Sequence, residues 1–233
     1  MNFINWMNQL DISTFLTAVI TVAASVICIV VHETSHGRTA LFLGDDTAQQ
    51  AGRLTLNPFK HIDIAGLLMM ALFHFGWAKP VPVDAGKLKH PKLGMAITAL
   101  AGPLSNVILA YFALLLRSIL CWLSVYDLYD LSDLLSYFIS FFEDIAIISI
   151  GLAVFNFIPI PPLDGSKIFF AILPKDIWKR LMKYEQYGIF ILMGLLFWGI
   201  LDSPMTLIRN GILNLLARCA WFPYEILSHI VFD

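Results

Sequence analysis

Apolar segments long enough to cross a lipid bilayer constrain this chain more than any other feature. A spanning helix needs about 20 mostly apolar residues. The candidates lie at about 12–42, 93–123 and 134–158, with a shorter one at 187–201. Hydrophobic residues make up 58% of the 233 residues and charged residues 14%, so a water-soluble globule would expose large apolar patches. The sequence therefore predicts an all-α polytopic membrane protein.

Charge and cysteine content exclude several other classes of protein. The net charge is −2, so no overall basic field would attract phosphate, and no nucleic-acid partner is expected. The cysteines Cys28, Cys121 and Cys219 lie far apart in the sequence without paired spacing. They are expected to be small apolar fillers rather than a disulfide framework or a metal cluster. The N-terminal stretch MNFINWMNQL has no Lys or Arg, which argues against a cleaved signal peptide.

The segments around these helices divide the chain into an expected core at 1–172 and a C-terminal helical extension at 173–233. Segment 44–92 is rich in charged residues, Gly and Pro, and it encloses a short apolar run at 64–77. This run is too short to span and predicts a re-entrant or interfacial element. The last segment, 204–232, mixes Arg and Asn with apolar residues, so it is expected either to cross the bilayer or to lie in its interface.

The distribution of basic residues predicts an orientation. Seven of the fifteen Lys and Arg residues lie in 38–92 and five lie in 167–183, whereas 124–133 carries only Asp as charged residues. Basic loops tend to stay on the cytoplasmic side of a membrane. We therefore expect a multi-pass protein of the cell membrane with its N-terminus outside and the segments 38–92 and 165–183 inside.

The first apolar segment ends in an HExxH pattern, His32-Glu33-Thr34-Ser35-His36. Histidines four residues apart lie on one helix face, so both rings reach one Zn²⁺ at about 2.0–2.1 Å. Glu33 is offset by one residue and can act as general base for a water at the open position of the metal. A chance match or a hydrated helix end are the alternatives. Because a long apolar run leads directly into the motif, its depth favours a metal site.

A hydrolytic zinc site usually has three protein ligands, so a third ligand is expected. Asp164 follows the third apolar segment, at the same inner end as the HExxH motif, where a proline-rich stretch breaks the helix. Glu143 and Asp144 lie roughly 12 Å from the outer end, whereas His32 lies roughly 30 Å from it. They are therefore expected to form an outer polar patch or a hydrated cavity. Alternative ligands on the cytoplasmic side are His61, His74 and His90.

These motifs resemble the site-2 protease family of intramembrane zinc metalloproteases. The HExxH motif precedes Asn-x-x-Pro-x-x-x-Leu-Asp-Gly at 156–165, as in that family. Between them, the stretch from Gly102 to Asn106 is similar to the family's Gly-x-x-x-Asn element. Segments 52–58 and 79–83 are similar to its membrane-embedded β-element. The resemblance covers about 12–172 and implies a minimal member without a PDZ-like or nucleotide-sensing domain.

The resemblance also implies the roles of the central residues. His32, His36 and Asp164 would bind one Zn²⁺, and Glu33 would be the catalytic base. The implied fold is a three-helix catalytic core with one or two C-terminal helices. A small membrane-associated β or re-entrant element would follow the first helix.

Several other residues have two alternative expected roles. Asn156 would be a polar partner of the substrate backbone or the transition state, or else a helix C-terminal cap. Asn106 would have either such a role or a hydrogen bond between helices, and the sequence does not decide between them. Gly102 is expected to permit close helix packing. Thr34, Ser35 and His74 are candidates for lining a water path, although Ser and Thr often bond back to their own helix.

The function expected from these features is zinc-dependent endopeptidase activity on transmembrane segments of single-pass or multi-pass membrane proteins, near the cytoplasmic face of the bilayer. Segments 52–58 and 79–83 would pair with an unwound substrate as an added strand, or plug the site against lipid. The alternative is a non-proteolytic zinc-binding membrane protein or transporter subunit. Polar residues gathered near one face disfavour a path through the bilayer.

Overall fold

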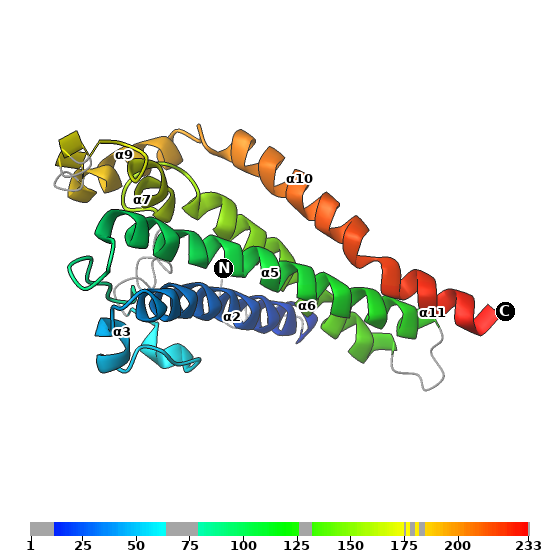
Figure 1. Cartoon of the computed structure of the whole chain (residues 1–233). Coiled ribbons are helices and arrows are strands. Elements are labelled where there is room, and N and C mark those ends of the chain that lie inside the picture. The colour runs from blue at the N-terminus through cyan, green and yellow to red at the C-terminus, as the bar shows by residue number, and fades with distance from the viewer. Residues whose placement is uncertain are drawn as a thin grey trace, which may run out of the picture.

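The computed structural model describes residues 12–63, 79–125, 132–174, 176–177, 180–181 and 185–232, and none of these residues lies in a strand. The helices are α2 (Ile12–Phe42), α3 (Thr47–Gln50), the 3₁₀ helix η1 (Pro58–Lys60), α5 (Pro91–Val125), α6 (Ser132–Asn156), α7 (Asp164–Phe170), α9 (Glu185–Phe197), α10 (Asp202–Ala220) and α11 (Phe222–Phe232). Figure 1 shows the long helices side by side, with α3 and α7 at the same end of the bundle.

Helices α2, α5 and α6 pack on one another in all three pairings. Their shared core consists largely of small side chains, including Ala24 and Cys28 from α2, Ala110 and Ala113 from α5, and Ala146 from α6. Small residues let helix backbones approach closely, which is how helices associate where lipid removes the hydrophobic driving force. The three-helix bundle therefore shows the close packing through small residues that is typical of membrane helices.

The outer faces of these three helices are apolar. Each helix is long and apolar enough to cross a membrane, and only 17%, 22% and 33% of their most apolar windows are buried inside the protein. Phe15, Leu104 and Phe112 are each more than half exposed. Such faces require lipid rather than water around them. The chain is a membrane protein, as its hydropathy predicts.

The ends of the helices differ slightly from the sequence prediction. Helix α5 extends past the predicted 93–123 at both ends, and its N-terminus is Pro91, a residue favoured at the first helical position. Helix α6 stops at Asn156 rather than at residue 158. Pro159 disfavours helical backbone at the residue before it, so the helix ends early.

The predicted β-element is not confirmed. Neither 52–58 nor 79–83 forms a strand, and the described part of 44–92 contains turns, α3 and η1. The turn after α2 uses Gly44, whose φ of +106° suits glycine. The predicted re-entrant run at 64–77 lies outside the described residues.

Helices α10 and α11 lie along the bundle, whereas α9 does not. Helices α9 and α10 are bent against each other by 87°, and Gly199 between them has a φ of +64°, which glycine adopts without strain. Helix α10 contacts α5 and α6, and α11 contacts α5, so α10 and α11 follow α5 in Figure 1. The bent pair is compatible with one broken span or with a re-entrant element, and both predictions for 204–232 stay open.

Candidate metal centre

The two histidines of the HExxH motif present the same ring nitrogen to each other. His32 and His36 are buried on one face of α2, with 4% and 8% of their surface exposed. Their Nε2 atoms lie 3.0 Å apart, and the rings meet edge to face with centroids 4.6 Å apart. The α-helical spacing of four residues produces this approach, because such residues are neighbours on one face.

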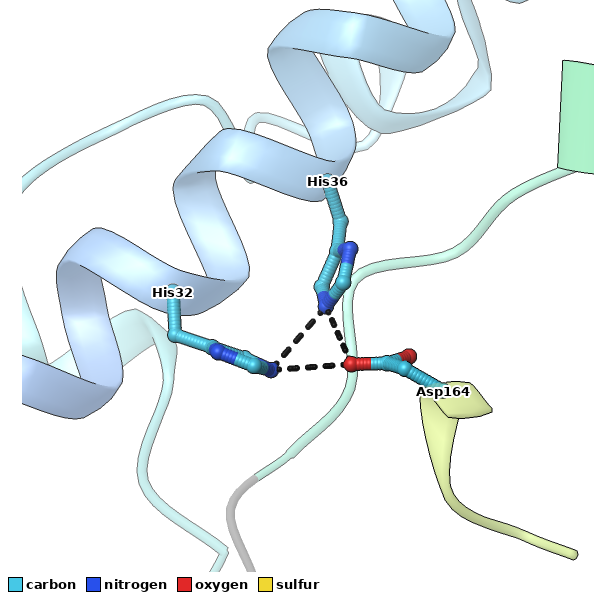
Figure 2. Close-up of side chains that lie close together, drawn as sticks. All are labelled: His32, His36 and Asp164. Atoms are coloured by element: carbon cyan, nitrogen blue, oxygen red, sulfur yellow. Dashed lines mark hydrogen bonds and ion pairs between the residues drawn. The ribbon is translucent and has the colours of Figure 1, made fainter. Parts of the chain in front are cut away.

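Asp164 completes a cluster of three potential metal ligands. Its Oδ2 atom lies 3.1 Å from Nε2 of His32 and 3.1 Å from Nε2 of His36. Figure 2 shows the three side chains converging from α2 and from the first turn of α7. Ligands held at about 2.0–2.1 Å around a tetrahedral zinc would lie about 3.3 Å apart. The donor types and their spacing therefore fit zinc.

The connection between α6 and α7 places Asp164. Prolines at 159, 161 and 162 prevent a continuous helix, and α7 restarts with Leu163 as its N-cap residue in extended backbone. A Cβ on Gly165 would lie only 2.3 Å from the carbonyl oxygen of Phe157, so glycine is required for this close return of the chain. Burial opposes ionisation of Asp164, but hydrogen bonds with His32 and His36 outweigh it. The pKa of this carboxyl is therefore well below its usual value.

Helix α5 supports both imidazoles from the opposite side. His36 Nδ1 lies 2.7 Å from the carbonyl oxygen of Thr98. A carbonyl can only accept, so Nδ1 carries a proton, and in the neutral ring the Nε2 lone pair is free to bind a metal. A Cβ on Gly102 would lie 2.4 Å from His36 Nε2 and 2.7 Å from His32 Cε1. Gly102 therefore leaves the space that both rings occupy.

Asn106 lies one turn further along α5. Its side-chain nitrogen Nδ2 is 3.3 Å from His32 Nδ1, and the residue is fully buried. Thr98, Gly102 and Asn106 follow one another at intervals of four residues, so one face of α5 contacts both rings.

Glu33 contacts the segment 79–83. Its Oε2 atom accepts a 2.9 Å hydrogen bond from the backbone N–H of Val81. This segment is held by Arg53, whose guanidinium donates to the carbonyl oxygen of Lys79 at 2.7 Å. The Lys79 N–H in turn donates to the carbonyl oxygen of His61 at 2.9 Å. The proposed base is thus oriented by backbone that is itself fixed at two points.

The remaining sequence candidates lie outside this cluster. The Asn156 amide donates to the Leu152 carbonyl of its own helix at 3.0 Å. His61 Nε2 lies 2.8 Å from the carbonyl oxygen of Thr55, and His90 is exposed. His74 is not among the described residues.

The acidic pair of α6 has other partners. Glu143 Oε2 accepts from Arg117 Nε at 3.4 Å, and Asp144 Oδ2 accepts from the Thr21 hydroxyl at 2.6 Å. Each contact joins α6 to a different helix of the bundle, which gives both carboxylates a structural role between helices.

The two described residues that were expected to line a water path, Thr34 and Ser35, are engaged in hydrogen bonds. The Ser35 hydroxyl donates to the Val31 carbonyl of its own helix at 2.7 Å, as serines in membrane helices often do. The Thr34 hydroxyl donates to the carbonyl oxygen of Thr55 at 3.2 Å, which joins α2 to the loop before η1.

Sequence reasoning missed the contributions of Thr98 and Val81, because both act through backbone atoms. The type of a residue does not indicate which atoms its backbone carbonyl or N–H contacts. The one usable signal was spacing: Thr98 precedes Gly102 by one helical turn, on the face that the Gly-x-x-x-Asn element defines.

Comparison with known proteins gives two matches. Residues 122–200 match the model of "Peptidase family M50", a range that includes the Leu-Asp-Gly element. The chain is also 34% identical over 168 residues to YwhC of Bacillus subtilis (strain 168), a protein that carries the name of a zinc metalloprotease. That alignment covers 72% of this chain and 75% of YwhC. No solved structure matches the chain significantly.

Proposed function

Because the chain belongs to peptidase family M50, the site-2 protease family, we propose that it is an intramembrane zinc endopeptidase. It cleaves peptide bonds in transmembrane segments of membrane-protein substrates. The observation that carries the proposal is the convergence of two imidazoles, His32 and His36, with the carboxylate of Asp164, which follows His32 by 132 positions of sequence. This donor set, with the glutamate of the HExxH motif beside it, is typical of hydrolytic zinc sites.

In this proposal each residue of the centre has one task. His32, His36 and Asp164 hold the ion. When bound there, zinc would act as a Lewis acid that polarises the scissile carbonyl and activates a water for attack. Glu33 accepts the proton of that water and later donates it to the leaving amine, as a general base and then a general acid. The hydrogen bond from Val81 keeps the Glu33 carboxylate in one orientation.

A substrate helix has to unwind before it is cleaved, because its carbonyls are engaged in hydrogen bonds within the helix. Two features support this step. An apolar cavity of about 520 Å³ lies between α5, the end of α6 and α10, and its lining includes Pro103 and Phe157. We propose that an apolar segment of the substrate occupies this cavity, whose lining belongs to the helices that surround the metal centre. The loop at 79–83 supplies backbone beside Glu33, and we propose that it receives the unwound chain.

We further propose that the catalytic core is 1–172 and that 173–233 supports it from outside. Helix α9 lies against the Asp164 loop, since a Cβ on Gly188 would lie 2.3 Å from the Pro161 carbonyl oxygen. The basic loops support a metal centre near the cytoplasmic face of the cell membrane, with the N-terminus outside. A protease-accessible tag inserted at 124–133 is expected to be cleaved from the outside of intact cells.

The test of the function is Glu33→Gln in detergent-solubilised or reconstituted protein. This variant is expected to bind zinc like the wild type and to lose cleavage of a transmembrane reporter. The matched control is Glu225→Gln, which changes an exposed glutamate on α11 and is expected to keep full activity. Unchanged cleavage by Glu33→Gln would refute the catalytic role. Zinc binding without reporter cleavage by the wild type would favour a non-proteolytic metal protein.

A further inference from the structure

Asn106 is buried beside His32 in a way that the proposed reaction leaves unexplained. None of its surface is exposed, and its Nδ2 atom is 3.3 Å from His32 Nδ1. Its Oδ1 atom is buried and has no hydrogen-bond partner among the described residues. A buried amide oxygen without a partner is costly, and such groups are rare in folded proteins.

The ring of His36 has a hydrogen-bond acceptor at Nδ1, and the ring of His32 does not. His36 Nδ1 faces the carbonyl oxygen of Thr98 at 2.7 Å, an acceptor that fixes the proton on Nδ1. Histidines that bind a metal usually donate their other ring N–H to such an acceptor, which sets the tautomer and the ring orientation. His32 faces the same need, because its Nε2 points into the cluster.

Asn106 can meet this need only through its oxygen. When the neutral His32 ring directs the Nε2 lone pair to a cation, Nδ1 carries the proton and becomes a donor. An amide NH₂ facing that N–H would oppose one donor with another. Turning the amide by about half a rotation brings the unpartnered Oδ1 to Nδ1–H. That single turn pairs Oδ1 with the Nδ1 proton.

We propose that Asn106 is a positioning residue for the metal centre, which holds His32 in its metal-binding tautomer by accepting a hydrogen bond from Nδ1 through its amide oxygen. The inference rests on the proposed zinc site and deepens it. It assigns the two α5 acceptors to the two imidazoles, Thr98 to His36 and Asn106 to His32. In this role Asn106 acts through His32 and does not touch the substrate.

The test measures zinc affinity in the solubilised full chain, by competition with a chromogenic chelator. Asn106→Leu keeps the volume of the side chain and removes the acceptor, and it is expected to weaken zinc binding by about 10- to 100-fold. Asn106→Asp keeps an acceptor oxygen and is expected to stay within about threefold of the wild type. Ser105→Ala is the control on the same helix, because the Ser105 hydroxyl donates to the Gly102 carbonyl of α5 itself. It is expected to bind zinc unchanged.

A second measurement separates positioning from general destabilisation. Loaded with Co²⁺, Asn106→Leu is expected to show an altered visible absorption spectrum, while its helical circular dichroism without metal matches the wild type. Zinc affinity of Asn106→Leu within threefold of the wild type overturns the inference. So does an Asn106→Asp protein that folds and binds zinc as weakly as Asn106→Leu. If Asn106→Asp does not fold, the Asn106→Leu result decides alone. A wild-type protein that binds no zinc refutes the proposed function instead.

Discussion

The backbone N–H of Val81 donates a 2.9 Å hydrogen bond to Oε2 of Glu33. A loop far along the chain therefore sets the orientation of the residue proposed as the base. The loop can approach α2 this closely because the next turn of the helix carries Gly37. A Cβ at that position would lie 2.5 Å from Leu54 Cδ2 and 2.9 Å from Val81 Cγ1.

The first prediction concerns Gly37→Ala. The added methyl group has to displace Leu54 and Val81, and the hydrogen bond to Glu33 is then lost or lengthened. A displacement of about 1 Å in a catalytic arrangement can lower the rate about 100-fold. We expect reporter cleavage to fall by about 10- to 100-fold while zinc affinity stays unchanged, as measured by turnover and chelator competition on the same preparation.

The control for this variant is Gly211→Ala on α10, because a Cβ there meets no atom within 4 Å. Both substitutions raise helix propensity by about 1 kcal/mol, so a difference between them reports the contact with the loop. Equal activity of the two variants would show that Val81 does not orient Glu33.

The second prediction concerns Gly102→Ala, which acts on the metal rather than on the base. The new Cβ would lie 2.4 Å from His36 Nε2, so the ring has to leave its place beside His32. We expect zinc affinity to fall by about 10-fold or more, with a cost in stability of about 1–3 kcal/mol from overpacking. Gly151→Ala on α6 is the matched control, since its nearest neighbour would be 3.9 Å away. If Gly102→Ala bound zinc as tightly as the wild type, the two rings would not depend on the space that Gly102 leaves on α5.

The sequence was most informative where side-chain chemistry and helical spacing decide the structure. The apolar run of α2 and the four-residue interval between His32 and His36 predict a helix with both rings on one face. Pro159 and the prolines after it predict a break before Asp164. Each of these features is local, so a short stretch of sequence contains all the information needed.

Features that depend on backbone atoms of distant segments could not be read in this way. Nothing in residue type indicates that the Thr98 carbonyl faces His36 or that the Val81 N–H faces Glu33. The expected β-element rested on resemblance alone, and turns with a short 3₁₀ helix stand in the described part of that segment. Tertiary contacts decide whether an extended loop pairs as a strand, so local pattern does not settle it.

The third prediction concerns pH and the turn after α2. Asp45 is fully buried, and its carboxylate accepts from the N–H and hydroxyl of Thr47 and from the N–H of Asp84. Burial opposes ionisation of Asp45, but these hydrogen bonds outweigh it and lower its pKa. A lowered pKa in the folded state adds stability above the unfolded-state pKa of about 3.9. That stability is lost as the pH falls through the folded-state pKa.

Thermal unfolding of metal-free protein between about pH 7 and pH 3 tests this sign. Asp45→Asn is expected to be less stable than the wild type at neutral pH, and the difference is expected to shrink as the pH falls below about 4. Asp46→Asn, which removes an exposed partner of Lys87, is expected to have a smaller effect because solvent screens that pair. A difference for Asp45→Asn that grows on acidification would show that the sign is wrong.

The last prediction links metal binding to stability. A ligand that binds only the folded state stabilises it by about 2.7 kcal/mol when present at 100 times its Kd. Adding zinc to metal-free protein is therefore expected to raise the unfolding temperature by several degrees, and a chelator is expected to reverse the rise. Glu33→Gln should keep the full rise, because Glu33 is not a proposed ligand, whereas Asp164→Ala should lose most of it. Asp176→Ala, which changes an exposed aspartate, serves as the control and should behave like the wild type. A full zinc-dependent rise in Asp164→Ala would mean that this carboxylate does not bind the ion. The 3.1 Å approach of Asp164 to both imidazoles would then be an ion pair alone.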